Sequence, residues 1–418
     1  MRTKLWVILM AGIVVSAVAI AKPTGRTIFS FGAGPKYGAR PKAGLIADRA
    51  GNLYGTTDSG GPAKAGTVYE LTPTDSGWKQ TILYDFCSVK QCADGNGPVA
   101  PLIFDGEGNL YGTTMYGGSD SCFGSGCGVV FELSPANGTW TETVLYALGP
   151  YESTYVVPSG LTFDKAGNLY FTCEACGLPN YMGTVSELSP SNGGWVETTL
   201  HAFPAFPTDG EEPSGTIIID EKGNLYGVTG TGGTGPNNIG GIVYELSPAG
   251  GAWTETVLYN FCSSANCSDG EAPLAALTPD GRGNLFGTTS YGGTGDSKQC
   301  ESDTGCGTVF ELTPSQSGEW AETVIHSFTG KDGDGAFPDQ TVIFDPKGNL
   351  YGTTDSIGAN GTVFQMVNDN GVWTERYRTF MAPPYHYPNG LLLERGSIYG
   401  TTRFGGAHET GAVFQITP

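Results

Sequence analysis

Short runs of alternating apolar and polar residues recur along most of this 418-residue chain, and glycine-rich stretches separate them. Residues 129–134 (VVFELS) show the pattern clearly, with apolar side chains at every second position. A period of two predicts strands that place one face in a core, and the intervening glycines, prolines and asparagines predict tight turns. We therefore expect an all-β protein.

One phrase, Gly-Asn-Leu-Tyr-Gly-Thr-Thr, occurs seven times with small changes, at spacings of 48 to 65 residues. The copies begin at Gly51, Gly108, Gly167, Gly223, Gly283, Gly348 and Gly396. A repeat of this length indicates one supersecondary unit per copy. In the second copy the expected strands are 101–105, 109–114, 129–134 and 140–148. Four strands joined by short turns form an antiparallel meander.

The two ends of the chain favour a closed ring over an open β-solenoid, whose rungs would be much shorter than this repeat. The last copy lacks its fourth strand, and residues 27–31 (TIFSF) near the N-terminus match that strand. We therefore predict a seven-bladed β-propeller of four-stranded antiparallel blades, closed by the N-terminal strand joining the last blade. Residues 22–418 would form this single domain.

The first 21 residues have the features of a secretory signal peptide. Arg2 and Lys4 precede an apolar run that ends in Ala-x-Ala sites, which favours cleavage over an uncleaved anchor. No later apolar run is long enough to span a membrane. The formal charge of −20 makes nucleic acid an unfavourable partner. We expect a secreted or periplasmic monomer without a membrane span after removal of the signal.

The ten cysteines form five close pairs in sequence: Cys87 and Cys92, Cys122 and Cys127, Cys173 and Cys176, Cys262 and Cys267, Cys300 and Cys306. An even count in an exported chain predicts disulfides. Zinc is the alternative, but Cys173-x-x-Cys176 has no second pair or nearby histidine to complete a tetrahedral site. Local pairing is expected, although cross-pairing within the second and fifth copies stays open. We expect no metal and no cofactor.

The loops of a meander emerge on opposite faces. One face should carry short Asp-x-x-Gly turns, in which the aspartate accepts hydrogen bonds from its own turn. These aspartates are Asp48, Asp105, Asp164, Asp220, Asp280 and Asp345. The bolder alternative is a ring of calcium- or sugar-binding carboxylates. The other face should carry the long loops and all ten cysteines, and loops on a rigid scaffold commonly bind ligands.

Several residues in the long loops are candidate ligand-binding residues. Four connecting loops share Asp-Gly-x-x-Pro, which gives Asp94, Asp209, Asp269 and Asp334. His386 and His408 belong to two loops of the seventh copy, close in sequence to Tyr385, Arg403 and Glu409. Together these groups could bind a polar ligand or transfer a proton. By contrast, His201 and His326 stand where other copies have Tyr84, Tyr146 and Tyr259, which predicts a packing role.

The phrase Asp-x-x-Gly-Asn-Leu-Tyr-Gly-Thr-Thr, followed by Gly-Gly and by Gly-Thr-Val-Phe-Glu-Leu as at 307–312, resembles the exported bacterial tandem-repeat family GloVer. It resembles more loosely the NHL-type propellers, which include binding modules as well as lyases and lactonases. The resemblance therefore implies a fold and no particular activity.

We expect a secreted binding propeller whose disulfide-rich face holds a glycan, a peptide or a cell-surface protein. The alternative is an extracellular hydrolase or lyase with its active site at the central mouth. The sequence contains no nucleophile elbow, phosphate-binding loop, HExxH motif or dinucleotide fingerprint. The residues that line the mouth should distinguish the two functions.

Overall fold

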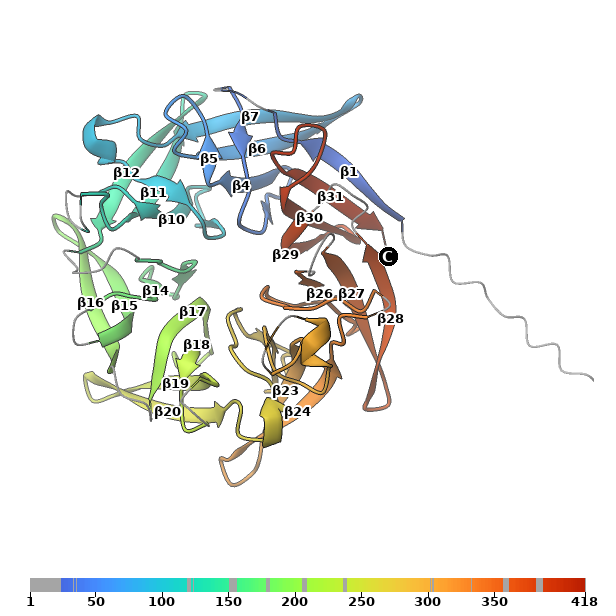
Figure 1. The fold of residues 1–418 in the computed structure, drawn as a ribbon. Helices are drawn as coiled ribbons and strands as arrows, with labels where there is room; N and C mark the ends of the chain where they lie inside the picture. The colour runs from blue at the N-terminus through green and yellow to red at the C-terminus, as the bar shows by residue number, and fades with distance from the viewer. Residues whose placement is uncertain are drawn as a thin grey trace, which may run out of the picture.

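The computed structural model describes residues 24–417 apart from short gaps at 33, 35, 119–121, 123, 150–155, 178–180, 205–208, 236–238, 301, 303, 332, 356–360 and 381–385. In this part the strands form seven antiparallel blades around a central axis, as Figure 1 shows. The predicted all-β, seven-bladed propeller is confirmed. The expected signal peptide lies outside the described residues.

Except in blade 7, each blade runs from its innermost strand to its outermost one in chain order. Blade 1 consists of β3 (Ile46–Ala47), β4 (Leu53–Thr57), β6 (Thr67–Thr74) and β7 (Gly77–Asp85). Blade 2 consists of β9 (Ile103–Phe104), β10 (Leu110–Tyr116), β11 (Val129–Ala136) and β12 (Thr139–Ala147), and β8 (Asn96–Pro98) also pairs with β10. Blade 3 consists of β13 (Thr162–Phe163), β14 (Leu169–Cys173), β15 (Tyr181–Ser191) and β16 (Gly194–Pro204). Blade 4 consists of β17 (Gly210–Ile219), β18 (Leu225–Gly232), β19 (Ile242–Ala249) and β20 (Ala252–Asn260).

The remaining blades follow the same plan. Blade 5 consists of β21 (Thr278–Pro279), β22 (Leu285–Thr289), β23 (Thr308–Pro314) and β24 (Trp320–Ser327). Blade 6 consists of β25 (Ile343–Phe344), β26 (Leu350–Thr354), β27 (Thr362–Asp369) and β28 (Val372–Phe380). Blade 7 consists of β29 (His386–Glu394), β30 (Ser397–Phe404), β31 (Ala412–Thr417) and β1 (Thr24–Ser30). The loops contain a short pair, β2 (Gly38–Ala39) with β5 (Ser59–Gly60), and the 3-10 turns η1 (Lys90–Cys92), η3 (Ala265–Cys267) and η4 (Ser297–Gln299).

The N-terminal strand closes the ring as predicted. β1 pairs antiparallel with β31, with Phe29 opposite Val413 and Ser30 opposite Ala412. Phe31 follows β1, is fully buried and stacks edge-to-face on Tyr69 of blade 1. The first and last segments of the chain therefore share one sheet, and the seam is packed against the next blade.

The glycine of Tyr-Gly-Thr-Thr is fixed by an aromatic ring on the neighbouring strand. A Cβ on Gly287 would lie 2.4 Å from Phe310 Cζ, directly across the β22–β23 ladder. The same cross-strand pairing joins Gly55 to Tyr69, Gly112 to Phe131, Gly227 to Tyr244, Gly352 to Phe364 and Gly400 to Phe414. In blade 3 the sizes are exchanged, with Phe171 opposite Ser186. The pair conserves volume, as a tightly packed core requires.

The first threonine of the same phrase connects adjacent blades. Thr56 donates a hydrogen bond to the carbonyl of Ala100, and Thr401 donates one to the carbonyl of Ala43 across the closure. Equivalent bonds join Thr113 to Ser159, Thr172 to Gly215 and Thr288 to Gln340. Four of the acceptors lie just before an innermost strand, and Gly215 lies within β17. β9 spans 103–104 rather than the expected 101–105, because only Ile103 and Phe104 pair with β10 and Pro101 has no N–H to donate to a ladder.

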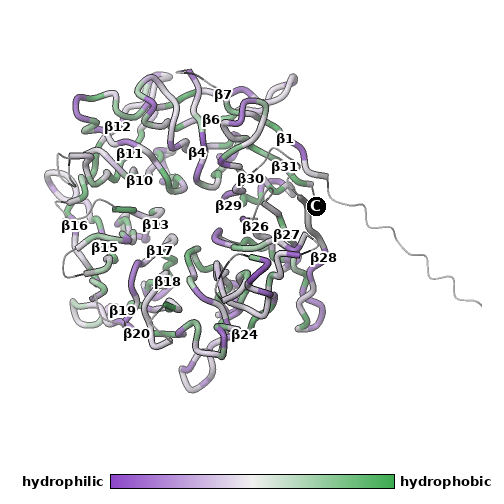
Figure 2. The backbone as a smooth tube through the Cα atoms, in the orientation of Figure 1, coloured by the Kyte–Doolittle hydropathy of each residue, from purple (hydrophilic) through white to green (hydrophobic). Residues whose placement is uncertain are grey.

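The hydrophobic core lies between the blades rather than within one sheet. One cluster combines Tyr54 and Val68 of blade 1 with Leu110 and Phe131 of blade 2, and Trp140 packs against it. The tryptophans that begin the fourth strands occupy corresponding positions, as in the packing of Trp373 on Phe286. Figure 2 shows hydrophobic segments running through the blades, with hydrophilic residues mainly in loops and turns. In the described part of the chain, we find no helix with the length and apolarity of a membrane span.

Candidate functional site

The aspartates that recur on the short-turn face are explained by the hydrogen bonds within each turn. Asp48 Oδ1 accepts from the backbone N–H groups of Ala50, Gly51 and Asn52 at 2.8–2.9 Å, and Oδ2 accepts from Asn52 Nδ2 and Tyr54 Oη. Partial burial alone would raise the pKa of Asp48, but these hydrogen bonds lower it. The other five turns repeat this arrangement in nearly every detail. The expectation that each aspartate serves its own turn is confirmed.

The four Asp-Gly-x-x-Pro aspartates lie at four different junctions between blades, so the structure does not bring them together. Asp94 is almost fully buried and accepts hydrogen bonds from Tyr84 Oη at 2.9 Å and from the backbone and hydroxyl of Ser88 at 2.8 Å. Asp269, between blades 4 and 5, accepts hydrogen bonds from the equivalent residues Tyr259 and Ser263. These contacts fix the start of each connecting loop.

His201 and His326 occupy the tyrosine position of that junction, as the sequence predicted. His201 lies opposite Val185 in the ladder, as Tyr84 lies opposite Val68. Both imidazoles stack edge-to-face on the next aromatic ring, with 4.6 Å between ring centroids. Each imidazole also faces the aspartate of its own connecting loop, which is Asp209 or Asp334.

The structure describes only part of the group predicted around blade 7. Arg403 ends near Asp58 of blade 1, with 3.7 Å between Nη2 and Oδ2. His408 and Glu409 are exposed in the loop that follows β30. His386 pairs through its backbone with Phe404 in the β29–β30 ladder, whereas its side chain and Tyr385 lie outside the described residues. Of this predicted group, the structure shows Arg403 in a charged environment.

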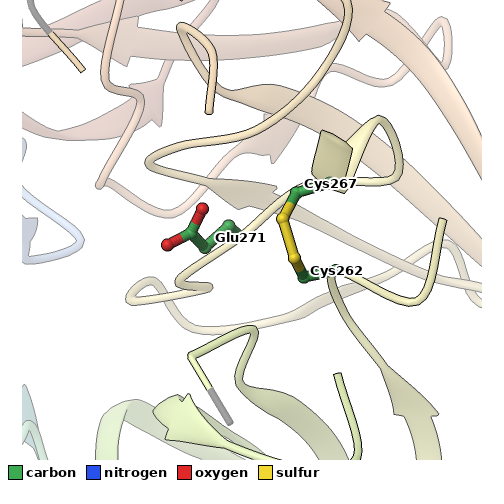
Figure 3. A group of neighbouring side chains, drawn as sticks. All are labelled: Cys262, Cys267 and Glu271. Carbon is green, nitrogen blue, oxygen red and sulfur yellow. A yellow bond between two sulfur atoms is a disulfide. The ribbon is translucent and has the colours of Figure 1, made fainter. Parts of the chain in front are cut away.

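All ten cysteines form the five local disulfides that were expected. Figure 3 shows one of them, between Cys262 and Cys267, with the carboxylate of Glu271 beside it. Because both sulfur atoms are used in the disulfide, this group offers no thiolate to a metal ion. The bridges instead restrain the loops on the long-loop face.

A central cavity of about 900 Å³ runs along the axis and is lined by the innermost segments of all seven blades. Its wall is largely apolar and small-chained, with residues such as Ala43, Val99, Gly160 and Ile217. Lys42 and Asp339 also line it and bring charge to the wall. An apolar cavity with a few polar groups at one end is the usual form of a small-ligand site.

Five ionisable residues from blades 6, 7 and 1 gather at this end of the cavity, and we call them the mouth cluster: Lys42, Asp58, Asp339, Asp355 and Arg403. Lys42 Nζ lies 3.1 Å from Asp58 Oδ2, and Arg403 approaches the same oxygen. Asp58, Asp355 and Arg403 occupy one equivalent position, directly after Thr-Thr at the end of the second strand of their blades. The ring therefore brings three charged residues together at one side of the mouth.

The backbone of the connecting loops positions these side chains. The N–H of Asp58 donates to the carbonyl of Arg40 at 3.1 Å, and the N–H of Asp355 donates to the carbonyl of Phe337 at 3.2 Å. Arg40 and Phe337 both precede a proline and have positive φ values of 59° and 56°. The same positive φ before a proline recurs at Glu212, Ala272 and Tyr387, so it is a property of the connecting loops of the repeat.

The electrostatics of the cluster are unbalanced. Burial, together with the charge of Asp339, raises the pKa of Asp355 to about 8, although Arg403 opposes the shift. Burial also raises the pKa of Asp339. Asp58 Oδ1 and Arg403 Nε are buried and make no hydrogen bond to the described residues. The cluster thus contains a carboxyl, that of Asp355, which keeps its proton near neutral pH. It also contains an acceptor, Asp58 Oδ1, and a donor, Arg403 Nε, that have no hydrogen-bond partner among the described residues.

Two pairs of aromatic rings belong to the loops and strand ends near the cluster. Phe404 lies between two guanidinium groups, with its centroid 5.5 Å from Arg40 and 5.3 Å from Arg403. Tyr387 is half exposed and packs edge-on against Phe404 at 5.9 Å. Tyr291 and Phe337 form a similar pair at 5.4 Å, and Tyr291 is also exposed.

Reasoning from the sequence did not identify the mouth cluster apart from Arg403. A signal was present at the position after Thr-Thr, which varies while its neighbours repeat. Its occupants are Asp58, Met115, Glu174, Gly230, Ser290, Asp355 and Arg403. A position that is variable within a constant phrase is where copies of a repeat acquire individual roles.

A family model described as the Gloeobacter/Verrucomicrobia repeat matches residues 12–233, 125–299 and 297–418. A search of curated proteins returned no match. Among solved structures, a candidate 6-phosphogluconolactonase from Bacteroides fragilis is 13% identical, with 87% of this chain and 96% of that chain covered and a TM-score of 0.53. The corresponding protein from Bacteroides uniformis is 14% identical, with 84% and 88% covered and a TM-score of 0.51. A protein from Lactobacillus plantarum is 14% identical, with 84% and 87% covered and a TM-score of 0.52. At these identities the likeness extends to the fold alone.

Proposed function

The chain belongs to the Gloeobacter/Verrucomicrobia repeat family, and we propose that it is an exported propeller that binds a glycan at the mouth of its central cavity. The observation that carries the proposal is the mouth cluster. There, a buried carboxylate oxygen of Asp58 and a buried guanidinium nitrogen of Arg403 both lack partners among the described residues. A sugar hydroxyl is a donor and an acceptor at once, so the hydroxyl groups of a glycan can pair with both kinds of atom.

The surroundings of the cluster suit the same class of ligand. Phe404, Tyr387 and Tyr291 offer exposed or partly exposed ring surfaces near the cluster, onto which the apolar face of a sugar ring can pack. The apolar cavity below can accept a less polar substituent of the ligand. Five disulfides are consistent with an oxidising compartment outside the cytoplasm, where glycans are available.

The test is a glycan array followed by calorimetric titration of the best glycan, with the oxidised protein. We expect Asp58→Asn and Arg403→Gln each to weaken binding by roughly 10- to 100-fold, the usual range for hydrogen bonds to charged groups. Lys347→Gln is the matched control, because Lys347 is exposed on the opposite, short-turn face. Binding that is absent from the array, or unchanged in both cluster variants, would contradict the proposal.

Hydrolysis or elimination at the same mouth is the second candidate function. It is favoured by the neighbouring carboxyls of Asp339 and Asp355, because burial raises the pKa of both groups and a carboxyl with a raised pKa can act as a general acid. If the bound glycan is cleaved, the Asp355→Asn variant should form no product and should retain its affinity for the glycan. Binding without turnover over hours would leave the protein as a binding module.

A further inference from the structure

Four of the blade junctions contain the same three-residue arrangement outside the mouth. A ring on the fourth strand of one blade faces the aspartate of the connecting loop, and a glutamate on the fourth strand of the next blade lies behind it. Two junctions have tyrosine: Tyr84 with Asp94 and Glu142, and Tyr259 with Asp269 and Glu322. Two have histidine: His201 with Asp209 and Glu255, and His326 with Asp334 and Glu375.

The histidine junctions bring three potential ligand atoms together. In each, one imidazole nitrogen and one oxygen from each carboxylate lie within 4.8 Å of one another. His201 Nε2 is 3.3 Å from Asp209 Oδ2 and 3.9 Å from Glu255 Oε2. His326 Nε2 is 2.9 Å from Asp334 Oδ1. The tyrosine junctions lack the nitrogen, and their hydroxyls already donate to the aspartates.

The junction at blades 3 and 4 also contains unused polar atoms. His201 Nε2 and Glu255 Oε1 are buried, and neither makes a well-aligned hydrogen bond to the described residues. Buried polar atoms without partners are uncommon in folded proteins, and each calls for an explanation such as a water or an ion. The three side chains remain about one-fifth exposed, which leaves a path for an ion and its water.

We propose that the two histidine junctions each bind one divalent transition-metal ion, with Zn²⁺ as the best fit. A neutral imidazole and two carboxylates balance the charge of such an ion and supply the ligand types that zinc prefers. Contraction to zinc–ligand distances of about 2.0–2.2 Å would leave a fourth position for water. The proposal revises the expectation, drawn from the sequence, that the protein binds no metal, and it is independent of the glycan site.

Such an ion would tie neighbouring blades together. His201 belongs to blade 3 and Glu255 to blade 4, whereas His326 belongs to blade 5 and Glu375 to blade 6. An ion that binds only the folded ring stabilises it in proportion to its free concentration above the dissociation constant. Zinc should therefore raise the melting temperature.

The experiment uses the mature, disulfide-oxidised protein, stripped with EDTA and titrated with zinc chloride alone. Bound metal is counted by elemental analysis after dialysis, and melting is followed in parallel. We expect two equivalents of zinc for the wild type, one for His201→Tyr or His326→Tyr, and none for the double variant. Tyrosine is the residue that this chain itself uses at the equivalent junctions, so these variants should fold.

Tyr259→His provides the reciprocal variant, because it converts a tyrosine junction into the histidine kind. We expect it to take up a third equivalent and to show a larger zinc-dependent rise in melting temperature. The proposal is overturned if the wild type takes up no zinc at tens of micromolar free metal, or if the double variant retains both equivalents. A folded Tyr259→His protein that stays at two equivalents would contradict the geometric basis of the site.

Discussion

At the scale of single residues, the positions of the repeated phrase make structural contacts. Its leucine is buried between blades, its tyrosine donates to the turn aspartate, and its glycine lies against an aromatic ring. Blade 3 shows that the last of these is a pair property, because Phe171 faces Ser186 where other blades place glycine and an aromatic residue. The large and the small side chain have changed strands, and their combined volume stays similar.

The pair predicts a compensating double mutant. Gly287→Ala should cost about 1–3 kcal/mol through overpacking against Phe310, and Phe310→Ser should cost about 3–5 kcal/mol through the cavity it leaves. The double variant Gly287→Phe with Phe310→Ser should lose clearly less unfolding free energy than the sum of the losses in the single variants Gly287→Phe and Phe310→Ser. Chemical denaturation measures each free energy of unfolding. Gly106→Ala is the control, since no atom lies within 4 Å of the added Cβ and the effect should be within about 0.5 kcal/mol. Strict additivity would contradict the pairing.

At the scale of strands, alternation and turn chemistry were enough to predict the second, third and fourth strands of the repeat. In blade 2 the observed β10, β11 and β12 begin within one residue of the expected strands. The innermost strand of blade 2 was predicted too long, because only Ile103 and Phe104 pair with β10 and Pro101 has no N–H to donate. The carbonyl of Ala100 just before them accepts a hydrogen bond from Thr56 of blade 1, a contact between blades that a pattern within one repeat does not contain.

The closing strand predicts a sharp dependence of stability on a short segment. A protein that begins at Phe31 lacks β1 and leaves the edge of β31 unpaired. Loss of Ile28 and Phe29, which are partly buried in the cluster beside blade 1, should remove about 2–3 kcal/mol of hydrophobic stabilisation, and the free edge should promote aggregation. Thermal melting with light scattering measures both effects. The matched control begins at Thr24 and keeps β1, so equal melting temperatures for the two proteins would show that this strand does not hold the ring.

At the scale of the whole molecule, closure decides which residues can act together. Asp339, Asp355, Arg403, Asp58 and Lys42 are separated by nearly the full chain length and meet only because blade 7 lies between blades 6 and 1. Histidines were chosen as candidates because they are scarce in the sequence. The rarity of a residue does not predict where it lies around the axis of the ring. The fold was therefore predictable from the repeat, whereas the mouth cluster required the ring.

The packing of successive blades places acidic groups next to one another at the junctions, which predicts that stability falls as the pH rises. Burial and the charge of Asp94 raise the pKa of Glu142 to about 7, and burial and the charge of Asp269 raise that of Glu322 to about 8. A carboxyl with a raised pKa in the folded state binds its proton more tightly there than when unfolded, where its value is near 4.5. Its stabilising effect is complete below pH 4.5 and is lost as the pH rises through 7 to 8.

We expect unfolding free energy to decrease between pH 5 and pH 8, by on the order of 1 kcal/mol for each junction because solvent screens these partly exposed groups. The net charge of −20 at pH 7 acts in the same direction. Glu142→Gln with Glu322→Gln should flatten the profile, and glutamine is tolerable there because Gln80 occupies the equivalent position in blade 1. Urea denaturation at several pH values measures the slope. The hydrogen bonds of their own turns lower the pKa values of Asp48, Asp105 and Asp164, and these three groups add the opposite trend only at more acidic pH. A slope that is unchanged in the double variant would place the pH dependence elsewhere in the ring.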